Sequence, residues 1–275
     1  MPCFIRRLTS SGLHAVDYSA DSLADAERHE PHGVYTITNT FHATRVLKLD
    51  AHLDRMENSA RLSGMPLTLD RPRMRAALRE MILASGYGDV RFRITVPRDE
   101  PETAILSLEP FKPLSPETYA NGVRVMTVQG TQRDNPGAKT TEWAHDRKAI
   151  EASFPPGVFT GLLVSADGDI LEGMSSNFYA IKSGMLRTAV EGVLPGISQQ
   201  IVLEVAPSVL PVQTTPIHLD DLPHISEAFI TSASRGIVPV IAIDDIVLGE
   251  GTPGPLTGQL RAAYKAWMDT NMQEL

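Results

Sequence analysis

A polar, proline-containing segment, Phe111–Asn121, separates two stretches of sequence whose hydrophobic patterns differ. Two prolines among polar residues are typical of a linker rather than of a buried element. The chain has 275 residues, of which 42% are hydrophobic and 21% charged. This composition is close to the average for globular domains of about 100–200 residues, and it argues against disorder, a collagen-like repeat or a coiled coil. We therefore expect two domains, residues 1–118 and residues 119–275.

The first stretch predicts a mixture of strands and helices. Alternating patterns rich in β-branched residues predict strands, and apolar residues at helical spacing predict helices. Asp70 is a good N-cap for the second helix, in which Pro72 comes early. The expected strands are His32–Thr40, Asp89–Val96 and Thr103–Glu109, and the expected helices are Asp50–Leu62 and Arg71–Ser85.

The second stretch predicts many short strands and fewer helices. Lys182-Ser183-Gly184, between two apolar runs, is typical of a hairpin turn. The expected strands are Val123–Val128, Gly161–Ser165, Asn177–Ile181, Met185–Thr188, Ala228–Thr231 and Pro239–Ile243, and the expected helices are Thr141–Ser153, Ser198–Val205 and Leu256–Met268. The fold class is therefore mixed α and β (α/β or α+β), with a small α/β lobe followed by a larger β-rich lobe that also carries helices.

Charge and cysteine content exclude several classes of function. The formal net charge is -8, from 25 basic and 33 acidic residues, which argues against a general electrostatic grip on nucleic acid. The single cysteine, Cys3, rules out an intramolecular disulfide framework and a cysteine-based zinc site, and we expect no metal. No stretch resembles a signal peptide or approaches the ~20 apolar residues of a membrane helix. We expect a cytoplasmic protein that binds neither membranes nor nucleic acid.

Two charged residues stand in positions suited to chemistry. Lys139 follows a Pro-Gly loop and precedes a helix. A lysine that is partly desolvated there favours the neutral amine needed to form a Schiff base; the alternative is a solvated surface lysine. Lys148, in a charged helical stretch, is the weaker candidate. Glu172 follows an Asp-Gly turn, where its carboxylate either holds a proton on a heterocyclic nitrogen or caps the turn of the following serines.

Two turns provide candidate phosphate-binding groups. Gly196-Ile197-Ser198 stands at a predicted helix start, where free backbone N–H groups and the helix dipole attract anions. The alternative is an ordinary helix capped by Ser198. The second turn, Thr231–Ser234, carries hydroxyls between two apolar strands and is either a second side of a phosphate site or a polar loop. Together, a lysine, an acid and two anion-binding turns are the parts that hold pyridoxal phosphate.

The order and wording of these motifs resemble the class IV aminotransferases, the fold-type IV pyridoxal phosphate enzymes. This group includes branched-chain aminotransferases, D-amino acid aminotransferases and aminodeoxychorismate lyases. The resemblance extends from about Gly33 to Ile243, and its most specific parts are ILEGMSSNFYAI, GVLPGIS and EAFITSASRGIVPV, in that order. It implies a two-lobed fold-type IV structure and pyridoxal 5'-phosphate as the cofactor.

The resemblance also implies roles for individual residues. Lys139 is the Schiff-base lysine and the catalytic acid and base, and Glu172 contacts the pyridine nitrogen. Arg55, in the motif His52-Leu53-Asp54-Arg55-Met56, binds the phosphate. The remaining cofactor-binding positions are Asn177 and Leu194 near the ring, the amides of Ile197 and Ser198, and the later turn at Ser232 and Ala233.

Substrate contacts are less specified. Arg91 and Arg93 lie two apart on one strand and so face the same side; one of them is a candidate for a substrate carboxylate, and solvated arginines on a sheet face are the alternative. Tyr35 and Thr38 match small-lobe positions near substrate in the family.

The leading hypothesis is an enzyme, a transaminase that moves an amino group between an amino acid or amine and a 2-keto acid. The alternatives are an aminodeoxychorismate lyase that releases pyruvate and a non-catalytic protein that binds the cofactor or another phosphate. The resemblance also implies a homodimer.

Overall fold

The chain folds into two compact units in the computed structural model, which describes residues 2–275. Unit 1 comprises the residues up to Lys112 together with Gly137–Asp146 and Asn271–Leu275, and unit 2 comprises Pro113–Pro136 and Arg147–Thr270. Both units contain helices and strands, which confirms the mixed fold class. The division after residue 118 stays a prediction; in the structure the chain enters unit 2 after Lys112, and two later segments return to unit 1.

Unit 1 is built on a five-stranded antiparallel sheet in the order β2-β1-β6-β5-β3. β3 therefore lies at an edge of this sheet, with one side open to another segment. The strands are β1 (Phe4–Thr9), β2 (Gly12–His14), β3 (Gly33–Asn39), β5 (Val90–Pro97) and β6 (Ala104–Pro110). The short strands β4 (Arg45–Leu47) and β17 (Met272–Glu274) pair separately.

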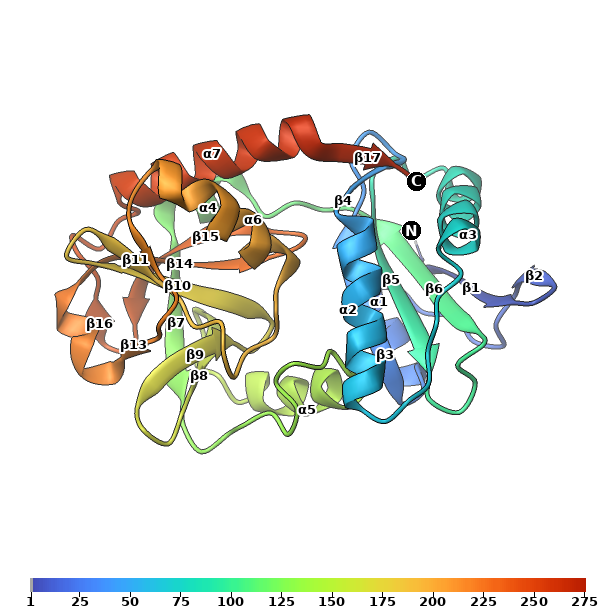
Figure 1. Cartoon of the computed structure of the whole chain (residues 1–275), viewed down its shortest axis with the longest axis horizontal. Coiled ribbons are helices and arrows are strands. Elements are labelled where there is room, and N and C mark those ends of the chain that lie inside the picture. Colours follow the sequence, from blue (N-terminus) through green and yellow to red (C-terminus); the bar gives the residue numbers. More distant parts are fainter. Residues whose placement is uncertain (1) are drawn as a thin grey trace. The chain divides into compact units, whose positions relative to one another are not determined.

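Helices cover both faces of this sheet. α2 (Leu49–Leu62) and α3 (Arg71–Ser85) pack on one face and form a core with Phe92 and Leu106. Figure 1 labels these two helices and the strands β5 and β6. α1 (Leu23–Ala26) and the 3-10 helix η1 (Glu27–His29) belong to the other face. The prediction for α3 is confirmed at both ends, and the Asp70 carboxylate accepts a hydrogen bond from the N–H of Arg73.

Unit 2 contains a ten-stranded mixed sheet, in which β16 pairs only with β15. The central path is β12-β11-β10-β14-β15-β7-β8-β9-β13. The strands are β7 (Val123–Val128), β8 (Val158–Val164), β9 (Asp169–Gly173), β10 (Ser176–Lys182), β11 (Met185–Arg187), β12 (Val212–Gln213), β13 (Ile217–His218), β14 (Ile225–Ser232), β15 (Gly236–Ile243) and β16 (Ile246–Val247).

Two helices of unit 2 pack on one face of this sheet. α6 (Ile197–Val205) and α7 (Pro255–Asn271, red in Figure 1) share a core with Tyr179 and Phe229. The buried Glu227 carboxylate on β14 accepts hydrogen bonds from the N–H groups of Leu256 and Thr257, so it caps α7 from the sheet. The other helical segments are α4 (Pro116–Asn121), α5 (Thr141–Glu151), whose first residues belong to unit 1, η2 (Ala206–Ser208) and η3 (Leu219–His224).

The segment Phe111–Asn121, expected to be a linker, is helical in its second half. Residues Pro116–Asn121 form α4, because the Ser115 hydroxyl accepts a hydrogen bond from the N–H of Thr118 and Pro116 stands at the first helical position. Serine followed by proline is a helix start signal as well as a turn signal. The sequence analysis also missed β1, β2 and α1 before residue 30.

The helices within residues 2–275 are too short or too polar to cross a membrane.

Candidate active site

Lys139 is held by its backbone at the open edge of β3. The N–H of Tyr35 donates to the carbonyl of Lys139 at 3.1 Å, and Val34 and Thr140 form an isolated β-bridge. The N–H of Lys139 in turn donates to the Ser59 hydroxyl at 3.0 Å. The segment before α5 thus extends the sheet of unit 1 by a short strand-like contact, which fixes where the lysine side chain begins.

The side chain of Lys139 lies against an aromatic ring. Its Nζ is 4.6 Å from the centroid of Tyr35, a residue that is only 4% exposed. The face of an aromatic ring attracts a cation, so this contact orients the amino group. Lys139 is half-buried, which favours a placed amine over the alternative of a freely solvated lysine.

Arg55 and His52 come from the buried side of α2 and meet at one hydroxyl. Arg55 Nη2 donates to Thr36 Oγ1 at 3.2 Å, and His52 Nδ1 shares a hydrogen bond of 2.7 Å with the same oxygen. Burial, followed by the nearby charges of Arg55 and Lys139, lowers the pKa of His52 well below 6.5. His52 is therefore neutral and suited to fix Thr36 beside the arginine.

The structure does not bring all four predicted substrate residues together. Tyr35 and Thr38 are three residues apart on β3, and they point to opposite faces of the sheet; Thr38 pairs with Phe92 on the core face. Arg91 and Arg93 lie on the same face of β5, as their spacing predicted, and the structure places Tyr35 on that face too. Arg91 lies 3.7 Å from the Glu109 carboxylate and is partly exposed.

Arg93 is buried in a network of carboxylates instead of standing solvated on the sheet. Its Nε is 2.7 Å from Glu30 and its Nη1 is 3.6 Å from Glu27, with side-chain exposures of 3% for Arg93, 0% for Glu30 and 5% for Glu27. Nε also donates to the Thr95 hydroxyl at 3.1 Å. The alternative of a solvated arginine therefore does not hold for Arg93.

In unit 2, Glu172 is a buried carboxylate with strong donors on both oxygens. It lies on β9, and its Oε1 accepts from Arg133 Nη1 at 2.7 Å while its Oε2 accepts from the N–H of Leu194 at 3.2 Å. Both side chains of the ion pair are 5% exposed. These contacts favour the ionised carboxylate, and they differ from the alternative of a cap on the serine turn.

Asn177 fixes the loop that leads to α6. Its Nδ2 donates to the carbonyl of Leu194 at 2.9 Å. A Cβ atom on Gly196 would stand 1.9 Å from Asn177 Oδ1, so only glycine fits at the point where loop and strand approach. Asn177, Leu194 and Glu172 are therefore brought together.

α6 begins at Ile197, with Gly196 as its N-cap. Glycine offers no capping side chain, so the first N–H groups, those of Ile197 and Ser198, are available to an anion. The alternative of a helix capped by Ser198 is wrong, because Ser198 lies inside the helix and its hydroxyl accepts from Tyr264 at 3.0 Å. Burial raises the pKa of Tyr264 to about 12, so this phenol keeps its proton.

The predicted hydroxyl turn joins β14 to β15 and contains Ser232 and Ala233. Arg235 Nε donates to Ser232 Oγ at 2.7 Å, and its Nη2 donates to Ser175 Oγ at 3.2 Å. Ser175 belongs to the turn between β9 and β10, directly after Glu172 and Gly173. Arg235 thereby ties the turn that contains Ala233 to the turn between β9, which carries Glu172, and β10, which carries Asn177.

These residues fit pyridoxal phosphate in chemical type. The group needs an amine for its aldehyde, a carboxylate for its pyridine nitrogen and N–H or guanidinium donors for its phosphate. Lys139 and Arg55 supply the first and part of the third in unit 1, and Glu172 and the start of α6 supply the others in unit 2. In residues 2–275 there is no group of three or more His, Cys, Asp or Glu side chains that is arranged to hold a metal ion.

Three residues of the candidate site, Arg133, Arg235 and Tyr264, were not predicted from the sequence. Arg133 stands six residues before Lys139 in a loop, and a lone basic residue in a loop carries no periodic signal. The signal that pointed to Arg133 was indirect: if Glu172 is buried, its carboxylate requires a cationic partner from elsewhere in the chain. Arg235 lay within the quoted motif, but its contact with Ser175 joins two turns 60 residues apart.

Comparison with known proteins matches residues 33–243 to the family described as amino-transferase class IV. A D-alanine aminotransferase of Bacillus licheniformis is 27% identical over 85% of this chain and 86% of its own length. A branched-chain-amino-acid aminotransferase of Pseudomonas aeruginosa is 24% identical over 82% and 80%. The solved structure of a branched-chain aminotransferase from Thermoproteus uzoniensis with norvaline has a TM-score of 0.79 at 20% identity, covering 100% of this chain and 99% of its own.

Proposed function

The chain belongs to the class IV aminotransferases, enzymes that depend on pyridoxal phosphate, and we propose that it transfers an amino group between an amino acid and a 2-keto acid with Lys139 as its catalytic residue. The observation that carries the proposal is the buried Glu172 carboxylate with Arg133 on one oxygen and the Leu194 N–H on the other. Burying an ion pair carries a desolvation cost that the attraction between the two charges often does not offset. Its presence here therefore supports a role in chemistry or specificity. A carboxylate held in its charged form suits the task of keeping a pyridine nitrogen protonated.

We propose specific residues for holding the cofactor. Lys139 binds its aldehyde covalently, and Glu172 accepts the pyridine N–H. Leu194 packs on the ring, and Asn177 fixes the Leu194 loop through the hydrogen bond to its carbonyl. The phosphate is bound by the Arg55 guanidinium and by backbone N–H groups of Ile197, Ser198, Ser232 and Ala233.

When bound, pyridoxal phosphate supplies an electron sink that stabilises negative charge at the substrate Cα. In that chemistry the Lys139 amine would remove the Cα proton and return a proton to the product, so it would act as general base and then as general acid. The Tyr35 ring keeps this amine in place between the two roles. Arg133 would keep the Glu172 carboxylate ionised during these proton transfers, so that the carboxylate can hold the proton on the pyridine nitrogen.

The family and the named relatives support a proposal for the substrate class. We propose an amino acid donor with an aliphatic side chain and the matching 2-keto acid as acceptor, because the two curated relatives act on D-alanine and on branched-chain amino acids by name. Tyr35 is the residue of unit 1 that we place next to substrate. Thr38 is left out of this proposal because it points to the core face of β3.

A half-reaction distinguishes this function from the others. Protein loaded with pyridoxal phosphate and mixed with L-valine, L-leucine or D-alanine alone is expected to yield one equivalent of keto acid and of pyridoxamine phosphate per chain with its preferred donor. The Lys139→Ala protein is the control and gives neither. Release of pyruvate from aminodeoxychorismate without amino exchange, together with no reaction in the panel, would contradict the proposal in favour of a lyase.

Two wider properties belong to the same proposal. We propose that the enzyme is a homodimer, which light scattering tests by giving twice the mass of the chain. We also propose that it works in the cytoplasm.

A further inference from the structure

Arg93 already has two buried carboxylate partners, Glu27 and Glu30. Burial raises the pKa of Glu30, and Arg93 opposes this effect by lowering it. A substrate carboxylate bound to the same guanidinium would be a third acid beside two carboxylates whose side chains are at most 5% exposed. The pairing therefore favours a different task for Arg93.

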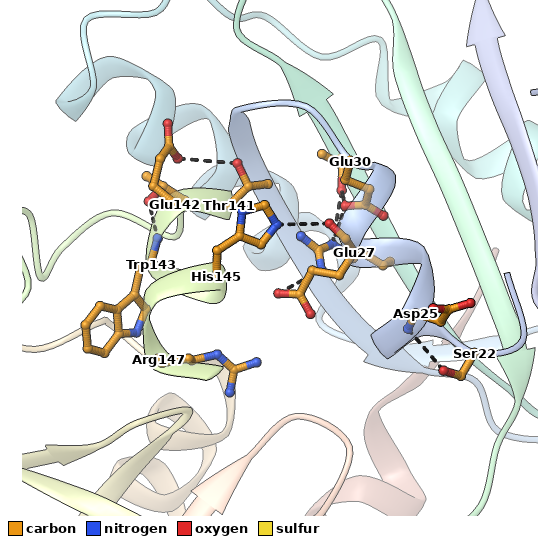
Figure 2. Close-up of polar contacts among 12 residues, drawn as sticks. Ser22, Asp25, Glu27, Glu30, Thr141, Glu142, Trp143, His145 and Arg147 are labelled. Carbon is orange, nitrogen blue, oxygen red and sulfur yellow. Dashed lines mark hydrogen bonds and ion pairs between the residues drawn. The ribbon is translucent and has the colours of Figure 1, made fainter. Parts of the chain in front are cut away.

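Hydrogen bonds connect the residues around Arg93 to the segment that carries Lys139. His145, on the first turns of α5, donates from Nε2 to the carbonyl of Glu27 at 2.9 Å, and the Thr141 hydroxyl donates to the carbonyl of Pro31 at 3.2 Å. Figure 2 shows His145 pointing toward Glu27, with Glu30 beside it. The acids and the lysine thus belong to one tightly connected part of unit 1.

Tyr35 connects the two cations. The Cζ atom of Arg93 is 4.0 Å from the centroid of the Tyr35 ring, and Nζ of Lys139 is 4.6 Å from the same centroid. Arg93 cannot move away from the ring without breaking its contacts with Glu27, Glu30 and Thr95. The guanidinium therefore fixes the ring, and the ring fixes the amine.

We propose that Arg93 is a positioning residue for Lys139: it holds the Tyr35 ring against the lysine amino group and, through its charge, increases the fraction of that amine that is neutral. This inference rests on the proposed function, in which a neutral Lys139 amine attacks the cofactor aldehyde and later accepts the Cα proton. It reassigns Arg93 from binding substrate to preparing the lysine.

The charges around Lys139 in unit 1 set the direction of the effect. Arg93 on β5 and Arg55 on α2 disfavour the ammonium form, whereas the Tyr35 ring and the more distant Glu27 and Glu30 favour it. His52 on α2 is neutral, and His145 on α5 contacts the carbonyl of Glu27. Removing Arg93 takes away a positive charge near Lys139, so the ammonium form of Lys139 should become more stable.

The test measures Lys139 directly in protein freed of cofactor. Trace labelling with an amine-reactive reagent over a range of pH, followed by peptide mass spectrometry, gives the pH of half-reaction for each of the six lysines. We expect Arg93→Gln to raise this midpoint for Lys139 by about one pH unit, the size expected for a unit charge less than ~10 Å away. Arg91→Gln, on the same strand but paired with Glu109, is the matched control and should leave the midpoint unchanged.

A second pair of variants covers the case in which Arg93→Gln does not fold. Tyr35→Leu removes the ring and should lower the Lys139 midpoint by about half a unit, because the ammonium loses a cation–π contact. Tyr35→Phe keeps the ring and should match the wild type. Equal midpoints for these two variants would overturn the contact on which the inference depends.

The rival role gives a different result. If Arg93 binds the substrate carboxylate, Arg93→Gln raises KM for the amino donor and leaves the Lys139 midpoint where it was, and that outcome would overturn the proposal. Failure of the protein to take up pyridoxal phosphate would refute the proposed function instead, and the midpoints in the cofactor-free protein remain informative in that case.

Discussion

At the scale of single residues, Glu172 shows how much of the site depends on a partner from another part of the chain. Its carboxylate is 5% exposed, and Arg133 on the loop before Lys139 supplies the neutralising charge. Removing one member of a buried ion pair leaves the other charge uncompensated, which costs about 3–5 kcal/mol. Arg133 is therefore expected to contribute to stability and, if Glu172 has its proposed role, to cofactor binding.

Arg133→Met tests this dependence. We expect the free energy of unfolding to fall by about 3 kcal/mol and the Kd for pyridoxal phosphate to rise tenfold or more, since tenfold corresponds to only about 1.4 kcal/mol. Urea unfolding and equilibrium dialysis measure the two effects. Arg187→Met is the control, because its ion pair with Asp221 is partly solvated and should contribute about 1 kcal/mol or less. Unchanged cofactor affinity in Arg133→Met would refute the role given to the Glu172 pair.

His52 makes stability depend on pH. Its pKa in the folded protein lies well below 6.5, chiefly because of burial, so the unfolded chain binds more protons than the folded one as the pH falls through 6.5. Folding stability is then full above pH 6.5 and decreases below it, by at most about 1.4 kcal/mol per pH unit. Relative to His52→Gln, the wild type should lose stability from pH 6.5 toward about pH 5.

Denaturant unfolding at several pH values measures this slope. Substitution of the exposed His14 by glutamine is the control for changes that do not involve a buried imidazole. Parallel curves for the wild type and His52→Gln over this range would contradict the assignment of a buried neutral histidine.

At the scale of elements, the segment before α5 is placed by a few hydrogen bonds at the edge of β3. Thr141 is fully buried, and its hydroxyl accepts from the N–H of Gly33 at 2.9 Å and donates to the carbonyl of Pro31 at 3.2 Å. The first turn of the helix is thereby tied to the start of the strand. This contact therefore also fixes the position of Lys139, two residues earlier.

Thr141→Val keeps the shape of the side chain and removes the hydroxyl. The N–H of Gly33 is then buried without its acceptor, which should cost about 1–3 kcal/mol. The amide of Tyr35, which donates to the Lys139 carbonyl, should also exchange its hydrogen faster than in the wild type. Hydrogen exchange detects this, and Thr140→Val, whose hydroxyl makes only a 3.5 Å contact with the Trp143 N–H, should show little change.

Elements with strong local signals were predictable from the sequence. The helix Arg71–Ser85 begins at a capping Asp70 and has proline in its first turn, and these local signals match the structure at both ends. β1 was missed because its Arg6 and Arg7 hide the alternation of a half-exposed strand. α4 was missed because Ser115 and Pro116 serve turns and helix starts equally well.

At the scale of the whole molecule, the motif order identified the family but not the partners of its residues. Lys139 and Glu172 could be proposed from the sequence because each belongs to a contiguous motif. The ion pair of Arg93 with Glu27 joins residues 66 positions apart, as their numbers show, and its partners come from a 3-10 helix that has no periodic pattern. Contacts of this kind depend on the packed sheet and not on local sequence.

The two units carry different parts of the proposed machinery. Unit 1 holds Lys139, Arg55 and Tyr35, and unit 2 holds Glu172 together with the start of α6. Each set is internally connected by its own hydrogen bonds. Among the six lysines of the chain, Lys139 is the one that we propose to form the covalent bond to the cofactor.

Borohydride reduction of the protein incubated with pyridoxal phosphate tests the assignment of Lys139. Reduction fixes the cofactor to the lysine that holds it, and peptide mass spectrometry locates the added phosphopyridoxyl group. We predict one group per chain on Lys139, its loss in Lys139→Ala and its retention in Lys148→Arg. A group fixed on Lys148, or no group fixed on any lysine, would contradict the account.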